Sequence, residues 1–313
     1  MVIARVLVAC VAFLAMAGCG AHEPAEIRNE KPAAGDAPPE GWRWETYRNV
    51  RLAVPEGWGY GTTGRQWCGR ADDESPFVGR PGSLRMYGCG SQVEGTMLES
   101  GGEFVWFGAD AGPGAPARVA GRIGNAQMTG ERAYLQAGLV TVAVQAPEVL
   151  RQKIIDSIGL VNTDQNGCSA KAPFAGNPDW RPQAVAVTEL VGIEAVSACQ
   201  YVEAHLRSST RLTGDEAVRA VRAITEAPLG AGPNSPASEC VPDEITTMEH
   251  LVLQIDAERP GVVDLRYGGC FHRGLDDGTT VRTLTRAAVQ PFVQGPNRVW
   301  GWSGDELSGI LEP

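Results

Sequence analysis

The stretch VTVAVQAPEVLRQKIIDSIGLV, residues 140–161, contains both periodicities that distinguish a β-strand from an α-helix. Valine recurs at every second position of its first five residues, which is typical of a strand with one buried face. Pro147 follows, and proline favours the first turn of a helix because its missing N–H has no partner to lose there. Leu150, Ile154 and Ile158 then fall on one helical face. The stretch therefore predicts a strand followed by an amphipathic helix.

Upstream residues extend this pattern into a first α+β domain over residues 42–163. Aromatic residues begin abruptly at Trp42, which marks the start of the folded region. Val50, Leu52 and Val54 alternate with other residues and predict a half-buried strand. We therefore expect a small antiparallel sheet that is closed by the late helix and a short final strand.

A polar break at residues 164–167 opens a second region, residues 164–313, which has the same kind of alternating and helical patterns. Three groups of alternating apolar residues predict strands: Val185, Val187 and Ile193; Leu251, Leu253 and Ile255; Val263, Leu265 and Tyr267. Segregated strands and helices again indicate α+β. The chain as a whole is thus expected to hold two tandem α+β domains, each an antiparallel sheet plus helix and each stapled by disulfides.

Two helices are expected in the second region. Thr213 and Glu216 have the spacing of a capping box, in which each side chain accepts a hydrogen bond from the backbone N–H of the other residue. This helix should end before Pro228, because the residue before a proline avoids the helical conformation. Apolar residues at helical spacing define the two buried faces: Ala217, Val221 and Ile224 for the first helix, and Val281, Leu284 and Ala288 for a last helix that ends near Pro291.

Residues 1–18 are typical of a secretory signal peptide. Arg5 precedes the apolar run 6–16, which is shorter than the about 20 residues that span a bilayer. Met-Ala-Gly-Cys at residues 16–19 resembles the lipobox of bacterial lipoproteins. That resemblance implies that Cys19 becomes the mature N-terminus, carries diacylglyceryl and palmitate-type chains, and anchors the protein to the outer face of the cell membrane. A transmembrane anchor and a plain cleaved signal peptide are the competing interpretations.

Residues 19–41 are rich in proline, alanine and charged residues, with Ile27 as the one large aliphatic residue. Such a segment buries too little apolar surface to offset its ordering entropy, so we expect a flexible tether. The chain carries a net charge of −10 and has no basic run, which disfavours nucleic acid as a partner. The expected partners are the membrane, through the lipid, and a ligand or protein of the cell envelope.

Six cysteines remain once Cys10 leaves with the signal peptide and Cys19 carries the lipid: Cys68, Cys89, Cys168, Cys199, Cys240 and Cys270. An even number outside the cytoplasm predicts disulfides. The two in the first region should pair, Cys68 with Cys89. In the second region we favour Cys240–Cys270 with Cys168–Cys199, and the other pairings of these four stay open. Because no closely spaced Cys or His pair occurs, we expect no metal site and no cofactor.

A search for catalytic motifs finds no nucleophile elbow, P-loop, dinucleotide fingerprint or zinc-protease motif. The densest polar cluster is Cys270-Phe-His-Arg-Gly-Leu-Asp-Asp-Gly278. Asp-Asp-Gly is typical of a tight turn, which is the interpretation we favour. The alternative is a site in which His272 is a base oriented by Asp276 or Asp277. We therefore assign no catalytic residue from the sequence.

Aromatic residues interleaved with glycine in residues 57–68 offer a second candidate, a loop that binds sugars or peptides. Its ring-bearing residues are Trp58, Tyr60 and Trp67. The competing interpretation places these rings in the domain core.

Two further resemblances concern the folded regions. VPEGWGYG at residues 54–61, together with residues 140–161, resembles the α/β/α sandwich of PsbP-type proteins, which implies a fold and no activity. ACQYV, RLTGDEA, APLGAGPNSP and YGGCFHRGLDDG, all within residues 198–284, resemble a domain of actinobacterial secreted lipoproteins of uncharacterised function. That resemblance implies location and fold kinship alone.

These observations favour a membrane-anchored, extracytoplasmic lipoprotein that binds a ligand or partner and has no enzymatic activity. The alternative is an extracytoplasmic hydrolase with its site around His272, Asp276 and Asp277. A purely structural envelope protein is the third hypothesis.

Overall fold

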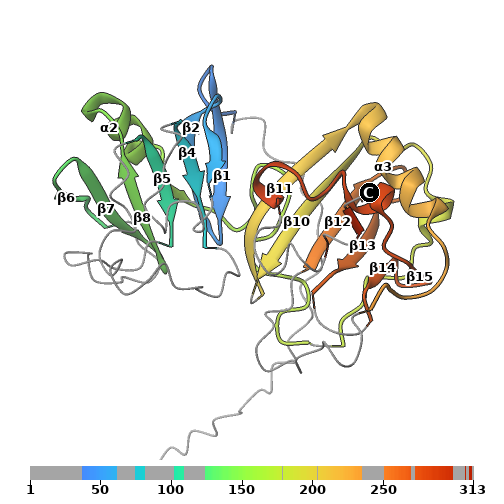
Figure 1. The fold of residues 1–313 in the computed structure, drawn as a ribbon. Helices are drawn as coiled ribbons and strands as arrows, with labels where there is room; N and C mark the ends of the chain where they lie inside the picture. The colour runs from blue at the N-terminus through green and yellow to red at the C-terminus, as the bar shows by residue number, and fades with distance from the viewer. Residues whose placement is uncertain are drawn as a thin grey trace, which may run out of the picture. The chain divides into compact units, whose positions relative to one another are not determined.

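Figure 1 shows the computed structural model of the chain. The structure describes residues 37–61, 75–81, 102–108, 124–177, 179–202, 204–234, 250–268 and 272–298, with Leu307, Ile310 and Leu311. It is rich in sheet and has few helices, which agrees with the α+β class.

Two sheets lie in the first region. The smaller one has the order β1-β2-β9 and is antiparallel, with β1 (Trp42–Tyr47), β2 (Val50–Pro55) and β9 (Gly159–Leu160). The larger has the order β3-β4-β5-β8-β7-β6, with β3 (Gly59–Gly61), β4 (Phe77–Gly79), β5 (Phe104–Phe107), β8 (Val140–Gln145), β7 (Arg132–Ala137) and β6 (Gln127–Thr129). The β3–β4 and β4–β5 pairs are parallel. The expectation of antiparallel strands is therefore wrong for these two pairs, because alternation along a strand is the same in either pairing.

The core of the first region forms where α2 (Glu148–Asp156) packs against β2 and β8. Every second residue of β2 and β8 is buried in this core, together with Ile154 of the helix. This confirms the strand and helix predicted from residues 140–161. The helix ends at Asp156, and the hydroxyl of the next residue, Ser157, donates a hydrogen bond to the carbonyl of Ile154.

Glu45 is a buried carboxylate that joins the two sheets of the first region. Its side chain on β1 is only 4% exposed and pairs with Arg80, which follows β4. Arg43 Nε donates to Glu45 Oε1 at 2.6 Å, and the hydroxyl of Tyr60 on β3 donates to the same oxygen at 3.0 Å. The Arg43 guanidinium also lies 4.8 Å from the centre of the Tyr60 ring. Arg80 also donates to the Thr46 carbonyl and Arg43 to the carbonyls of Pro55 and Glu56, but Glu45 is the carboxylate that both guanidinium groups share.

One sheet of order β11-β10-β12-β13-β14-β15 organises the second region. All its pairs are antiparallel, over β10 (Ala195–Val202), β11 (His205–Thr213), β12 (His250–Asp256), β13 (Gly261–Arg266), β14 (Gly274–Asp276) and β15 (Val281–Arg282). The described strands of each region pair only within that region. The division into two domains at Asp164 stays a prediction.

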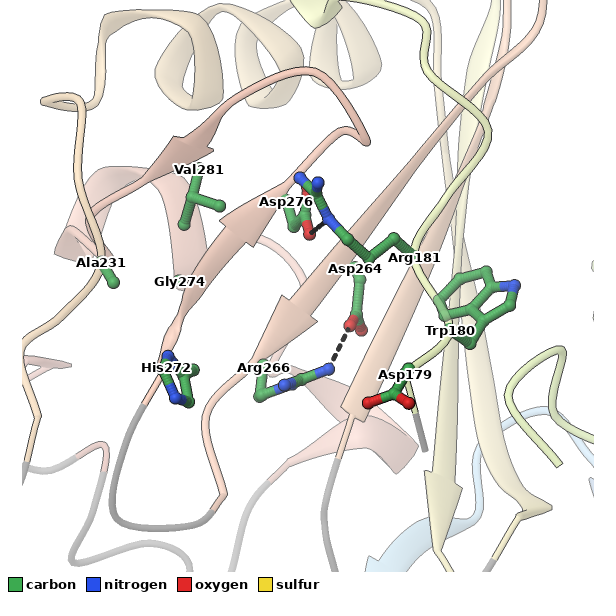
Figure 2. Close-up of a pocket in the computed structure, with 10 residues that line it drawn as sticks. All are labelled: Asp179, Trp180, Arg181, Ala231, Asp264, Arg266, His272, Gly274, Asp276 and Val281. Carbon is green, nitrogen blue, oxygen red and sulfur yellow. Dashed lines mark hydrogen bonds and ion pairs between the residues drawn. The ribbon is translucent and has the colours of Figure 1, made fainter. Parts of the chain in front are cut away.

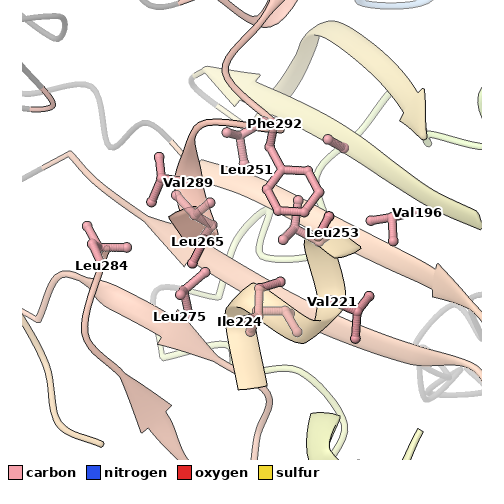
Figure 3. Close-up of a cluster of buried hydrophobic side chains, with 14 of the residues drawn as sticks. Val196, Val221, Ile224, Leu251, Leu253, Leu265, Leu275, Leu284, Val289 and Phe292 are labelled. Carbon is pink, nitrogen blue, oxygen red and sulfur yellow. The ribbon is translucent and has the colours of Figure 1, made fainter. Parts of the chain in front are cut away.

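Helices cover one face of this sheet. Figure 3 shows Val221 and Ile224 of α3 (Gly214–Glu226), with Phe292, over Leu253 of β12 and Leu265 of β13. These side chains are at most 2% exposed. The predicted faces of the first helix and of β12 and β13 are confirmed.

The predicted helix boundaries hold in part. The α3 helix ends at Glu226, before Pro228, as expected, and Thr213 is its N-cap residue. The Thr213 side chain makes no capping hydrogen bond, however, so the predicted capping box does not form. The last helix, α4 (Arg286–Val289), begins later than predicted because Thr285 caps it by accepting a hydrogen bond from the Ala288 N–H.

The predicted strand through Val185 and Val187 is wrong. Residues Val187–Glu189 form the 3-10 helix η1, and Val187 N–H donates to the Asp277 carboxylate at 2.9 Å. The backbone of this segment therefore hydrogen-bonds to the turn at Asp277 and not to a neighbouring strand. The second 3-10 helix, η2, covers Gly295–Asn297.

A long segment that we call the strap, residues 168–177 and 179–187, crosses the face of the second sheet opposite α3. Cys168 is disulfide-bonded to Cys199 of β10, which confirms that predicted pair. Phe174 and Trp180 of the strap pack with Tyr201 in a small buried cluster on this face. The strap therefore hides part of a sheet face that would otherwise meet water.

We predict that Glu45→Gln lowers the free energy of unfolding by about 3–5 kcal/mol, because it leaves buried guanidinium groups unpaired. The matched control is Asp256→Asn, which removes the carboxylate of an exposed pair with Arg211 and should cost about 1 kcal/mol or less. Denaturant unfolding of both variants measures the difference. Equal losses would show that the Glu45 cluster is not a structural link.

Candidate functional site

The side chains that alternate with the apolar core of β12, β13 and β14 point to the other face of the sheet. His250 pairs in register with Arg266, and Asp264 with Asp276, at positions where neighbours face the α3 core. Period-two alternation places these four polar residues together on the strap side. The fold thus gathers a set of charged side chains beneath the strap.

A pocket of about 430 Å³ is lined by three of these four residues, Asp264, Arg266 and Asp276. It lies in the range of about 300–1,000 Å³ that is typical of small-molecule sites. The strap, β13, β14 and β15 contribute most of its lining. The lining residues are Asp179, Trp180, Arg181, Ala231, Asp264, Arg266, His272, Gly274, Asp276 and Val281 (Figure 2).

Asp264 is a deeply buried acid in the lining of this pocket. Its side chain is 3% exposed, and Oδ1 lies 2.9 Å from Nδ1 of His250. Arg266 Nη2 approaches the other oxygen at 3.4 Å. An ionised aspartate only accepts hydrogen bonds, so we assign the proton of the His250 contact to Nδ1. The His250 ring in turn packs against the Phe174 ring of the strap, with centroids 4.5 Å apart and planes tilted by 32°.

Arg181 and Asp276 form the exposed rim of the pocket. Arg181 Nε and Nη2 each donate to one oxygen of Asp276, both at 2.7 Å. This two-pronged hydrogen bond and the attraction of the carboxylate raise the pKa of the Arg181 guanidinium above its ordinary value. The pair holds the end of the strap against β14.

His272 lines the same pocket near its opposite end. Its backbone has φ of +62°, a left-handed conformation that a residue with a Cβ rarely adopts. In Figure 2 its imidazole lies beside Arg266 and well away from Asp276. The predicted alignment of His272 by Asp276 is therefore not the arrangement in the structure, where Asp276 is engaged by Arg181.

Asp277 forms a tight turn and is absent from the lining of the pocket. Its carboxylate accepts hydrogen bonds from the N–H groups of Thr279, Thr280 and Val187, and Gly278 has a φ of +81°. This is the turn that Asp-Asp-Gly predicts. Burial alone would raise the pKa of Asp277, but the side-chain bond from Thr279 and the backbone donors outweigh it and lower that pKa.

Two of the three aromatic residues of the predicted binding loop, Trp58 and Tyr60, make contacts that support the fold of the first region. Trp58 is 6% exposed and belongs to the core of the first region. The hydroxyl of Tyr60 is hydrogen-bonded to Glu45. Burial, together with the charge of Glu45, raises the pKa of Tyr60 to about 12. Trp67 lies outside the described residues.

The structure describes two of the six cysteines that are predicted to form disulfides. The Cys168–Cys199 bond is present, and both residues are fully buried. Cys19, Cys68, Cys89, Cys240 and Cys270 lie outside the described residues. In the described part of the chain, no group of three or more His, Cys, Asp and Glu side chains is placed to hold a metal ion.

The pocket residues Asp264, Arg266 and Arg181 were not singled out in the sequence. The signal that could have found two of them is the alternation of β13, in which Asp264 and Arg266 occupy the positions between the apolar residues. Such positions normally face water, and only the strap, far away in sequence, converts them into a pocket. Comparisons with protein-family models, curated proteins and solved structures find no match for this chain.

We predict that Asp277→Asn lowers the free energy of unfolding near pH 7 by about 1–3 kcal/mol, since neutral acceptors make weaker hydrogen bonds than a carboxylate. Because the pKa of Asp277 is lower in the folded state, ionisation of its carboxylate stabilises the fold at pH values above the unfolded-state pKa of about 3.9. This stabilisation is lost as the pH falls through the folded-state pKa. The gap between the two proteins should therefore narrow on acidification. Denaturant unfolding between about pH 7 and pH 2 tests this, and a constant gap would contradict it.

Proposed function

We propose that this protein is a lipid-anchored, extracytoplasmic binding protein without enzymatic activity, and that the pocket of the second sheet is its ligand site. The observation that carries the proposal is Asp264, a nearly fully buried carboxylate that lines an open cavity of about 430 Å³. Burying a charge is costly unless it is paired. A fixed charge beside an open cavity is typical of a ligand-binding site.

The chemistry of the lining supports binding in preference to hydrolysis. Among the described lining residues there is no serine, threonine or cysteine to act as a nucleophile. Asp264 and Asp276 are each paired with an arginine. Asp277 is engaged by three backbone N–H groups, and this geometry suits a turn better than a catalytic acid.

Export and anchoring rest on the leader 1–18, the lipobox at residues 16–19 and the polar tether 19–41. None of the described helices has both the length and the apolar character needed to cross a membrane. Two or more acyl chains on Cys19 would hold the protein stably, since one chain binds only marginally. The remaining disulfides, Cys68–Cys89 and Cys240–Cys270, and the two-domain arrangement belong to the same proposal.

The anchor is tested by metabolic labelling with an alkyne analogue of palmitate in a bacterial host. We predict that Cys19→Ala abolishes labelling and moves the protein out of the membrane fraction, because no thiol remains for the lipid. Cys10→Ala is the matched control and should label like the unmodified protein, since residue 10 leaves with the signal peptide. Labelling of the Cys19→Ala variant would exclude this anchor.

The pocket is tested by filling it. Ala231 is exposed at the pocket wall, so Ala231→Trp should occupy the cavity without disturbing the core. We predict that a mixed panel of sugars, amino acids, carboxylates and phosphates yields a ligand in calorimetry, and that Ala231→Trp weakens its binding about tenfold or more. Val191→Trp, at a residue already 57% exposed outside the pocket, should bind normally.

Two results would overturn the binding proposal. The first is equal binding by the two tryptophan variants. The second is turnover of a panel compound or a chromogenic ester or glycoside that His272→Ala abolishes, which would favour the hydrolase alternative around His272, Asp276 and Asp277.

A further inference from the structure

Four of the five carboxylate and guanidinium groups that line the pocket are paired with each other, and the fifth, Asp179, belongs to a residue exposed to solvent. Arg181 is neutralised by Asp276 through two hydrogen bonds of 2.7 Å. Arg266 is paired with Asp264. An anionic ligand would compete with Asp264 and Asp276 for the two guanidinium groups, and a cation would compete with the two guanidinium groups for these carboxylates. A ligand without net charge avoids both penalties.

The same pairs leave donors and acceptors unused. The Arg266 side chain is 26% exposed, and its one hydrogen bond among the described residues is the long contact of 3.4 Å between Nη2 and Asp264. Among the described residues, each oxygen of Asp264 makes one contact, and a carboxylate oxygen can accept a second hydrogen bond. A hydroxyl group both donates and accepts, so neighbouring hydroxyls on one ligand could donate to Asp264 and accept from Arg266.

The ends of the pocket are less polar than its middle. Figure 2 shows Ala231 and Val281 toward one end and the Trp180 ring toward the other, with Arg266 and Asp264 between them. Trp180 is held by Phe174, with ring centroids 6.1 Å apart. An aromatic ring supported in this way can pack against the C–H face of a sugar ring while the polar middle binds its hydroxyls.

From these three features we infer that the pocket binds a neutral sugar, a mono- or disaccharide unit, with Asp264 and Arg266 hydrogen-bonding its hydroxyls and Trp180 stacking on its ring. The inference rests on the proposed function and names the ligand class of that site. In an extracytoplasmic setting the source would be the glycans of the cell envelope.

The experiment is calorimetry and ligand-observed NMR on the purified full chain in detergent. The probes are glucose, galactose, mannose, arabinose and maltose, with phosphate, citrate and glutamate as anionic competitors for the same site. We predict binding of at least one neutral sugar with an affinity that is unchanged by added salt, because an uncharged ligand has no Coulomb attraction to screen. An anion held by Arg266 would instead bind more weakly as salt is added.

Substitutions then locate the sugar. Arg266→Gln should weaken its binding about tenfold or more, and Trp180→Leu about threefold to tenfold through loss of ring stacking. Arg211→Gln, at another arginine of the same sheet that pairs with an aspartate outside the pocket, should leave it unchanged. Thermal melting of each variant verifies that the fold is retained.

The outcomes separate the two proposals. Binding of anions alone, with strong salt dependence and sensitivity to Ala231→Trp, overturns the sugar and keeps the binding function. Sugar binding that neither Arg266→Gln nor Ala231→Trp weakens overturns the assignment to this pocket. If no compound binds, both the sugar and the proposed function fail.

Discussion

The attachment of the strap to the second sheet is the constraint on which the rest of the site depends. The strap is fixed near one end by the Cys168–Cys199 disulfide and near the other by the Asp277 carboxylate, which accepts from Val187 N–H. The disulfide closes a loop with a sequence separation of 31, which on the chain-entropy model stabilises the fold by roughly 3–4 kcal/mol. Without these attachments, the face that carries Asp264 and Arg266 would be an ordinary wet surface, and its charges would be screened by water.

This arrangement also explains why turn and pocket have different roles although they are adjacent in sequence. Asp276 and Asp277 are neighbours, and alternation sends their side chains to opposite sides of the chain. Asp276 faces the strap and binds Arg181, whereas Asp277 is 3% exposed and orders the turn that positions β14 and β15. The turn therefore supports the site without lining it. A residue pair that resembles a catalytic cluster in sequence is separated by the fold into one rim residue and one structural residue.

The elements that could be predicted are those with strong local periodicity. The valines of β8, the face of α3 formed by Val221 and Ile224, and the apolar positions of β12 were all identifiable because burial recurs at a fixed spacing. The failures have non-local causes. Val187 sits in a 3-10 turn because its N–H binds Asp277, 90 residues away, and the parallel pairing of β4 leaves no mark in its own alternation. The pocket could not be predicted for the same reason, because the strap and β13 are far apart in sequence and become neighbours only in the folded protein.

Two buried carboxylates among the described residues, Glu45 and Asp264, show how a structural charge differs from one available to a ligand. Glu45 accepts from Arg43, Tyr60 and Arg80, and these partners come from both sheets of the first region. Its oxygens are surrounded by protein donors, so its role is to join the sheets. Asp264 is buried to a similar degree, yet it has one partner on each oxygen and an open cavity beside it. A buried carboxylate with spare acceptor capacity beside a cavity has its remaining hydrogen bonds to make with something other than the fold. That difference in partners, more than burial, is what distinguishes a binding site from a structural link in this chain.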